Sequence, residues 1–99
     1  MVTLVNGGTL YDGTKIEVID CKHCTDMSVQ AKGTGTYTVM GRLESDLDYI
    51  ELTGVSRILE TATNITDNQI YGYDVTTLES ITLSSVTGFD KIEAVLVSK

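Results

Sequence analysis

Hydrophobic and polar residues alternate along several short stretches of this chain, which is the pattern of β-strands with one buried face. In the clearest stretch, TYTVMGRL at residues 36–43, threonines and Arg42 occupy one face, and only Met40 breaks the alternation. The opposite face, which we predict to be buried, consists of Tyr37, Val39, Gly41 and Leu43. Similar patterns predict strands at residues 15–20, 27–31, 70–75, 80–87 and 91–97, with weaker candidates at 2–5, 49–52 and 57–60.

Turn residues separate these stretches. Glycines punctuate the chain at NGG, DG, KGTG and TG, and proline is absent. The most helix-like segment, VSRILETATN, is short and rich in β-branched residues, so we expect at most one helical turn. Turn signals about every 8–15 residues are typical of sandwiches and small barrels. We therefore predict an all-β fold, a single antiparallel β-sandwich of the jelly-roll-like kind, formed by one domain over residues 1–99.

The last predicted strand, within KIEAVLVSK, is hydrophobic on both faces. Ile92, Ala94 and Leu96 share one face, and Val95 and Val97 share the other. Such a strand is either central in a sheet, or its outer face contacts another subunit.

Composition narrows the classes of function. The chain has 99 residues, a net charge of −7 and seven scattered basic residues, so we do not expect nucleic acid as a partner. No apolar run approaches the roughly 18 residues of a membrane-spanning helix, and the N-terminal residues MVTLVNGGTLYDG lack the pattern of a signal peptide. We therefore expect that the protein does not associate with a membrane. We also expect that it is made in a reducing cytoplasm.

Both cysteines and the only histidine lie within DCKHCTD. A reactive Cys-x-x-Cys pair needs its first cysteine at the N-terminus of a helix, and no helix is predicted here. A structural zinc ion needs four ligands, and Cys21, His23 and Cys24 have no second pair. In a strand the two thiols would point to opposite faces, although a turn could bring them together. We interpret the cysteines as structural and predict no metal, with a redox or zinc protein as the third-ranked alternative.

Two other groups have both a structural and a functional interpretation. Acidic residues gather in LESDLDYIEL without the spacing of a calcium loop, and we interpret this segment as a hairpin tip closed by Ser45 and Asp46. Tyr71 and Tyr73 share a strand face and could form a platform on which a sugar ring stacks. Val75 continues that face, which favours burial in the core instead.

Catalytic motifs are missing from the sequence. The single histidine provides no Ser-His-Asp set in a suitable context, and the GTG segment is not followed by a helix that could hold phosphate. We predict no enzymatic activity and no cofactor.

The order of segments resembles the small β-sandwich proteins that tailed bacteriophages and prophages carry as virion accessory components. The resemblance covers residues 29–98, where a threonine-rich strand leads to a turn with Ser45 and Asp46 and an aromatic residue, Tyr49, three positions beyond the aspartate. One departure is Leu47, because glycine or asparagine often follows the turn aspartate in such proteins. A later strand with an Ile-Tyr pair and an Asp-Val pair, followed by a short turn that contains leucine, also matches such proteins. Its residues here are Ile70, Tyr71, Asp74, Val75 and Leu78.

The resemblance implies a structural, non-enzymatic virion protein of the capsid decoration, head-fibre or tail accessory type, made in the host cytoplasm. We expect it to bind the outer capsid surface, with the major capsid protein or another virion protein as partner, as a homo-oligomer or symmetric array. The candidate contact surfaces are the N-terminal segment, which could add to a neighbour's sheet, and the outer face of the last strand. Their residues are Val2, Thr3, Leu4 and Val5, and Val95 and Val97.

The alternative function comes from a different class. A carbohydrate-binding adhesion module would recognise a cell-surface glycan through Tyr71 and Tyr73.

Overall fold

The computed structural model describes residues 5–98, and within that range it has nine β-strands and no helix. All strand pairs are antiparallel, in the order β1-β9-β3-β8-β5-β6, with β2 also on β9 and with β4 and β7 also on β3. The all-β prediction is confirmed. None of the described residues belongs to a helix long and apolar enough to cross a membrane. The strands are β1 (Val5–Tyr11), β2 (Ile19–Asp20), β3 (Cys24–Arg42), β4 (Ile50–Glu51), β5 (Gly54–Ser56), β6 (Thr61–Ala62), β7 (Asn64–Ile65), β8 (Tyr71–Asp74) and β9 (Ser80–Ser98).

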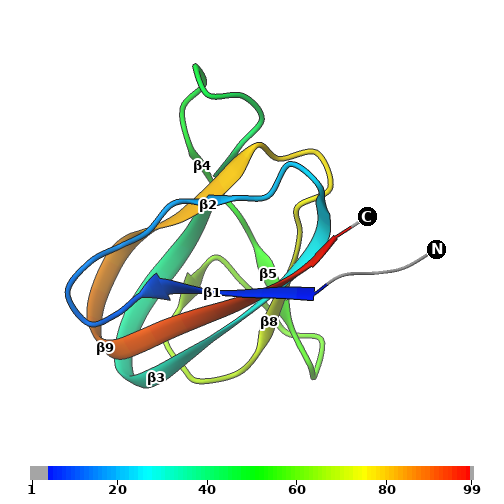
Figure 1. The fold of residues 1–99 in the computed structure, drawn as a ribbon. Helices are drawn as coiled ribbons and strands as arrows, with labels where there is room; N and C mark the ends of the chain where they lie inside the picture. The colour runs from blue at the N-terminus through cyan, green and yellow to red at the C-terminus, as the bar shows by residue number, and fades with distance from the viewer. Residues whose placement is uncertain (1–4, 99) are drawn as a thin grey trace.

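Two long strands, β3 and β9, run side by side through the whole molecule (Figure 1). Each has 19 residues, and they pair from Cys24 opposite Ser98 to Arg42 opposite Ser80. The separate strands predicted at 27–31 and 36–43 are therefore parts of β3, and those predicted at 80–87 and 91–97 are parts of β9. The prediction of turns at KGTG and at the TG before Phe89 was wrong.

Glycines bend these two strands without ending them. The register of β3 against β9 shifts between Lys32 and Gly33 and again before Thr36, as expected of β-bulges. Gly33 and Gly88 have positive φ angles of 96° and 77°, which favour glycine. At Gly35 the two backbones approach so closely that a Cβ atom would lie 1.8 Å from the Thr87 carbonyl oxygen. The glycine pattern thus marks a sharp bend in a continuous ladder.

The bend folds the sheet over itself. Before the bend, β3 pairs with β8 and with the second half of β9; after it, β3 pairs with the first half of β9 and with β4 and β7. Strands that pass from one layer to the other through bulges are the usual way to build the corner of a β-sandwich. The two halves of the sheet therefore form two layers around a common core.

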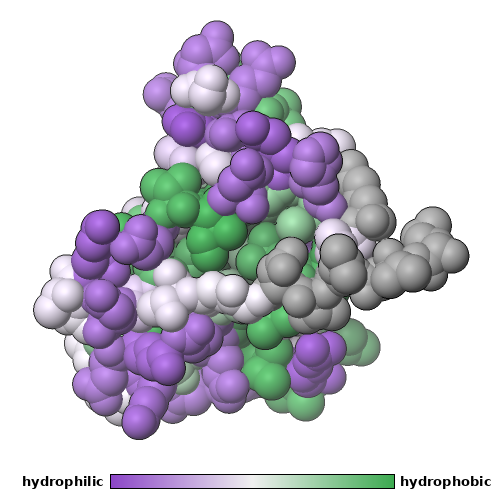
Figure 2. Space-filling model, viewed as in Figure 1, coloured by the Kyte–Doolittle hydropathy of each residue, from purple (hydrophilic) through white to green (hydrophobic). Residues whose placement is uncertain are grey.

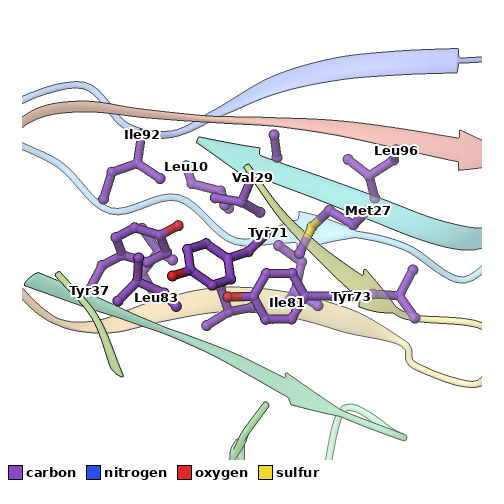
Figure 3. Packing of buried hydrophobic residues seen from close by; sticks show 14 of the residues in the cluster. Leu10, Met27, Val29, Tyr37, Tyr71, Tyr73, Ile81, Leu83, Ile92 and Leu96 are labelled. Carbon is purple, nitrogen blue, oxygen red and sulfur yellow. The ribbon is translucent and has the colours of Figure 1, made fainter. Parts of the chain in front are cut away.

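Side chains from both layers meet in this core (Figure 3). The ring centroids of Tyr37 and Phe89 lie 5.6 Å apart in an edge-on arrangement close to the bend. The fully buried face of β9 contains Ile92, Ala94 and Leu96, as the sequence predicts. The other labelled members of the core are Leu10, Met27, Val29, Tyr71, Tyr73, Ile81 and Leu83.

Several predicted elements differ at their ends. Tyr37, Val39 and Gly41 are buried as expected, but Leu43 is 56% exposed because β3 ends one residue before it. The predicted strand at 57–60 is a turn between β5 and β6, and most of the segment 15–20 is loop, with only its last two residues in β2. In both places hydrophobic residues lie on the surface, which the strand pattern cannot distinguish from residues that pack.

The bend predicts that replacement by alanine destabilises the protein much more at one glycine of the sheet than at another. Gly35→Ala should lower the free energy of unfolding by about 1–3 kcal/mol, since the new methyl group collides with backbone that cannot rotate away. Gly72→Ala is the matched control, because the nearest atom to its Cβ would be the Val55 carbonyl oxygen at 3.7 Å, an ordinary van der Waals contact. Urea unfolding of both variants measures the difference, and equal stabilities would contradict this account of the bend.

Candidate interaction surfaces

The outer face of β9 carries the two residues predicted for partner binding. Val95 is 44% exposed and Val97 is half-buried, both on the face opposite the core. β9 lies between β1 and β3, so its central position accounts for a strand that is apolar on both faces. Contact of this face with a partner stays a prediction.

A shallow groove crosses this outer face at Val95. Pairing places Val95 between Gly7 on β1 and Ser28 on β3, and the row continues to Gly72 on β8. Small residues in this row leave Val95 raised beside a groove of about 340 Å³. The groove is lined by Ser28, Val29, Gln30, Arg57, Ile70, Glu93 and Val95.

The other predicted contact segment is largely outside the described part of the chain. Val2, Thr3 and Leu4 lie outside the described residues, and so does the side chain of Val5. The backbone of Val5 pairs with Val97, so this end of β1 adds to the protein's own sheet. Its binding to a neighbour stays a prediction.

Tyr71 and Tyr73 are core residues. Each is only 3% exposed, and their rings point into the space between the layers (Figure 3). A Cβ atom on Gly54 would lie 2.6 Å from Cζ of Tyr73, so the ring packs directly on the backbone there. Because a buried ring face cannot stack on a sugar, the core interpretation of these residues holds and the carbohydrate-binding alternative loses the site on which it was based.

The three core tyrosines differ in how their hydroxyl groups are satisfied. The Tyr71 hydroxyl donates a hydrogen bond to Oδ2 of Asp67 at 3.2 Å. Burial alone would raise the pKa of Asp67, but hydrogen bonds from Gln69 and Tyr71 outweigh it and hold that pKa below its usual value. The hydroxyls of Tyr37 and Tyr73 are buried and have no hydrogen-bond partner among the described residues.

The cysteines lie at the two ends of a turn. The Cys24 amide donates to the Cys21 carbonyl oxygen at 3.0 Å, and the Cys21 thiol faces the Leu78 carbonyl oxygen at 3.5 Å. Both residues are buried. Burial raises the pKa of Cys21 to about 11, which keeps its thiol protonated at neutral pH and therefore unreactive. This placement agrees with the structural interpretation of the cysteines.

His23 is exposed beside the two buried thiols. Within residues 5–98, no group of three or more His, Cys, Asp or Glu side chains is placed to hold a metal ion.

The acidic segment 43–49 forms a loop that projects from one end of the molecule (top of Figure 1). Its turn is closed by the Leu47 amide, which donates to the Glu44 carbonyl oxygen at 3.1 Å. Hydrophobic side chains at the base of this loop surround an apolar groove of about 330 Å³, which we call the leucine groove. Its apolar side chains are Leu43, Leu47, Ile50, Leu52 and Leu78.

A polar network braces the base of this loop. Arg42 Nε donates to Oε1 of Glu79 at 3.0 Å, and its guanidinium carbon lies 4.5 Å from the centroid of the Tyr49 ring. The Tyr49 and Ser80 hydroxyls are 2.8 Å apart, and Ser80 also donates to Glu79 at 2.6 Å. Sequence reasoning missed this network, because only the pairing of β3 with β9 brings its members together.

A second exposed apolar feature is the turn between β5 and β6. Ile58 is 68% exposed and Leu59 is 82% exposed. We call residues 57–60 the hydrophobic turn. The sequence signal is the apolar pair Ile58 and Leu59, and its pattern predicts a weak strand instead of an exposed turn.

Removal of the hydroxyl group should affect stability differently at Tyr71 and at Tyr73. Tyr71→Phe removes the bond to Asp67 and should lower the free energy of unfolding by about 1 kcal/mol. Tyr73→Phe removes a buried hydroxyl without a partner and should leave stability equal or higher. Thermal unfolding of the two variants and the parent protein measures this, and a larger loss for Tyr73→Phe would contradict it.

The brace at the loop base predicts a dependence of stability on pH. Hydrogen bonds from Ser80 and Arg42 hold the pKa of Glu79 below its usual value of 4.5. A depressed folded-state pKa means that the stabilisation is complete above about 4.5 and is lost as the pH falls through the folded-state value. Glu79→Gln should therefore be less stable than the parent at pH 7, and the difference should shrink at pH 3. A difference that stays constant across this range would contradict the role of the Glu79 charge.

Solved structures of other proteins share this fold. No protein-family model matches the chain, and no curated protein matches it. The SPBc2 prophage-derived protein YomS is similar with a TM-score of 0.84 at 15% identity, over 99% of this chain and 96% of that one. The PBSX exported protein XepA is similar with a TM-score of 0.84 at 14% identity, over 99% of this chain and 39% of that one. At such low identity the likeness shows the fold alone, and at that level the resemblance to phage and prophage proteins is confirmed.

Proposed function

We propose that this protein is a structural, non-enzymatic component of a tailed-phage or prophage particle, and that it decorates the outer surface of the capsid. Its partner in this proposal is the major capsid protein or another virion protein, and many copies bind in a symmetric array. Its location is then the virion, after synthesis in the host cytoplasm.

The single observation that carries the proposal is the likeness to YomS over nearly the whole length of both chains. YomS is a prophage-derived protein, and the likeness covers 99% of this chain and 96% of YomS. Fold likeness alone does not assign a function, so the particle role also depends on the properties of this chain.

Those properties fit a particle component. The net charge of −7 favours solubility of the free protein before assembly. The apolar features of the surface are shallow grooves and an exposed turn, which suit contact with another protein surface. Binding of many copies in a symmetric array multiplies a modest affinity of each contact.

Mass spectrometry of purified particles tests the proposal. Particles would be induced from the source organism, or grown from the phage, banded on a density gradient and searched for peptides of this chain. A copy number comparable to that of the main shell protein is expected for capsid decoration, and a few copies per particle would move the protein to a tail or fibre. Free protein in the lysate with none in the particle band would overturn the virion role.

A pair of variants tests the contact surface. Val95→Asp places a charge in the groove on the outer face of β9 and should reduce the copies per particle about tenfold. Val18→Asp is the matched control, because Val18 is 58% exposed and lies outside the grooves described above. Equal incorporation of the two variants would exclude the β9 face as the contact.

A further inference from the structure

The hydrophobic turn is closed by three hydrogen bonds although its apolar side chains are exposed. The Leu59 amide donates to the Ser56 carbonyl oxygen at 3.0 Å, and the Glu60 amide donates to the Ser56 hydroxyl at 3.1 Å. The Ser56 amide in turn donates to the Glu60 carbonyl oxygen at 2.8 Å. The backbone that carries Ile58 and Leu59 is thus fixed by hydrogen bonds, which lowers the backbone entropy lost when a partner covers these residues.

The backbone of this turn is unfavourable for the residue that it displays. Leu59 has a φ angle of 65°, in the left-handed region where glycine or asparagine is favoured over leucine. Leucine here contributes little to packing, since 82% of it is exposed. Strain of this kind persists mainly at binding and catalytic sites, so the side chain of Leu59 points to a role in binding.

The leucine groove lies at the opposite end of the molecule from the hydrophobic turn. In Figure 1 the 43–49 loop is at the top and the turn after β5 is at the lower right. Figure 2 shows hydrophobic surface at that lower right corner and a hydrophilic tip on the loop. The groove, at about 330 Å³, falls in the range of about 300–1,000 Å³ that accommodates small ligands, and it can therefore receive two aliphatic side chains.

Charge also matches between the two features. Asp48 lines the leucine groove, with Glu44 and Glu51 on the adjoining loop and strand, whereas Arg42 in the same lining is already paired with Glu79. Arg57, beside the two apolar residues of the turn, forms no ion pair among the residues that the structure describes. The other charge of the turn, Glu60, accepts a hydrogen bond from Gln69 Nε2 at 3.2 Å. The acidic rim of the apolar groove therefore fits the Arg57 side of the apolar turn.

We propose that the hydrophobic turn of one copy of this protein inserts into the leucine groove of a second copy, with Arg57 facing the acidic rim. The turn supplies Ile58 and Leu59 as anchors, and the groove receives them between the 43–49 loop and Leu78. Each chain has one turn and one groove, so the contact joins two different surfaces and assembles reciprocal pairs, rings or chains of copies. This self-association rests on the proposed function, because it would supply contacts between copies in the array on the particle. It is tested on purified protein without particles, so the self-association and the virion function can each fail without the other.

The test uses two complementary variants of the full chain. In the turn variant, Ile58→Ser and Leu59→Gly remove the anchors, and the glycine also relieves the backbone at the positive φ angle. In the groove variant, Leu47→Ser and Ile50→Ser replace two exposed members of the groove, 46% and 65% exposed, whose loss leaves the core intact. Val18→Ser is the control for loss of an exposed hydrophobic residue elsewhere, and circular dichroism establishes that each variant is folded.

Light scattering coupled to size-exclusion chromatography gives the masses. The parent protein and Val18→Ser should elute at a multiple of the 10.7 kDa chain mass, and each double variant alone should elute as a monomer. An equimolar mixture of the two double variants should restore a one-to-one complex, since the intact turn of one copy meets the intact groove of the other. A monomeric parent protein, folded variants that keep the parent mass, or a mixture that stays monomeric would each overturn the proposal.

Discussion

The close antiparallel pairing of β3 with β9 across their glycine bend is the constraint on which the rest of this structure depends. The two strands account for most of the ladder, and every other strand pairs with one of them directly or through β8 and β5. Their approach at Gly35 is possible only because that position lacks a Cβ atom. Since both strands bend at the same place, one continuous sheet supplies both layers of the sandwich and the edge-on contact of Tyr37 with Phe89 between them.

This construction separates the core from the surfaces that can bind partners. The bend holds the buried side chains in the middle, while the 43–49 loop and the turn after β5 extend from opposite ends. The loop is fixed at its base by Arg42, Glu79 and Tyr49, so its position depends on the same β3–β9 ladder. The surfaces can therefore differ between proteins of this fold while the ladder stays the same.

Sequence alone predicted the parts of this fold that depend on local pattern. Alternation identified the buried faces around Val39 and Ile92, and it placed Val95 on the outer face, because a side chain in a strand follows its neighbours two positions away. It failed at KGTG, since a glycine that ends a strand and a glycine that bends one have the same local sequence. Only the partner strand, more than fifty positions away along the chain, distinguishes the two cases.

The surface features were harder to predict for a related reason. Ile58 and Leu59 are residue types that are common in strands, but here they are exposed because they lie in a turn. Three hydrogen bonds close that turn: two join the backbones of Ser56, Leu59 and Glu60, and the third joins the Glu60 amide to the Ser56 hydroxyl. Tyr71 and Tyr73 have the composition of a binding platform, and their burial follows from the second layer, which covers them. In each case a side chain's role depends on what lies across the sheet from it, and that is set by non-local pairing.

Low identity together with close agreement in fold follows from the same physics. YomS shares 15% of its residues with this chain at a TM-score of 0.84, which is possible if the fold requires alternating apolar positions and a bend and tolerates many particular side chains at each. Residues outside the core, such as Leu59 and Asp48, are free of that requirement. A leucine at a positive φ angle on the surface therefore has no explanation in core packing, and the contact that we propose for it is the place to look for what distinguishes this protein from others with its fold.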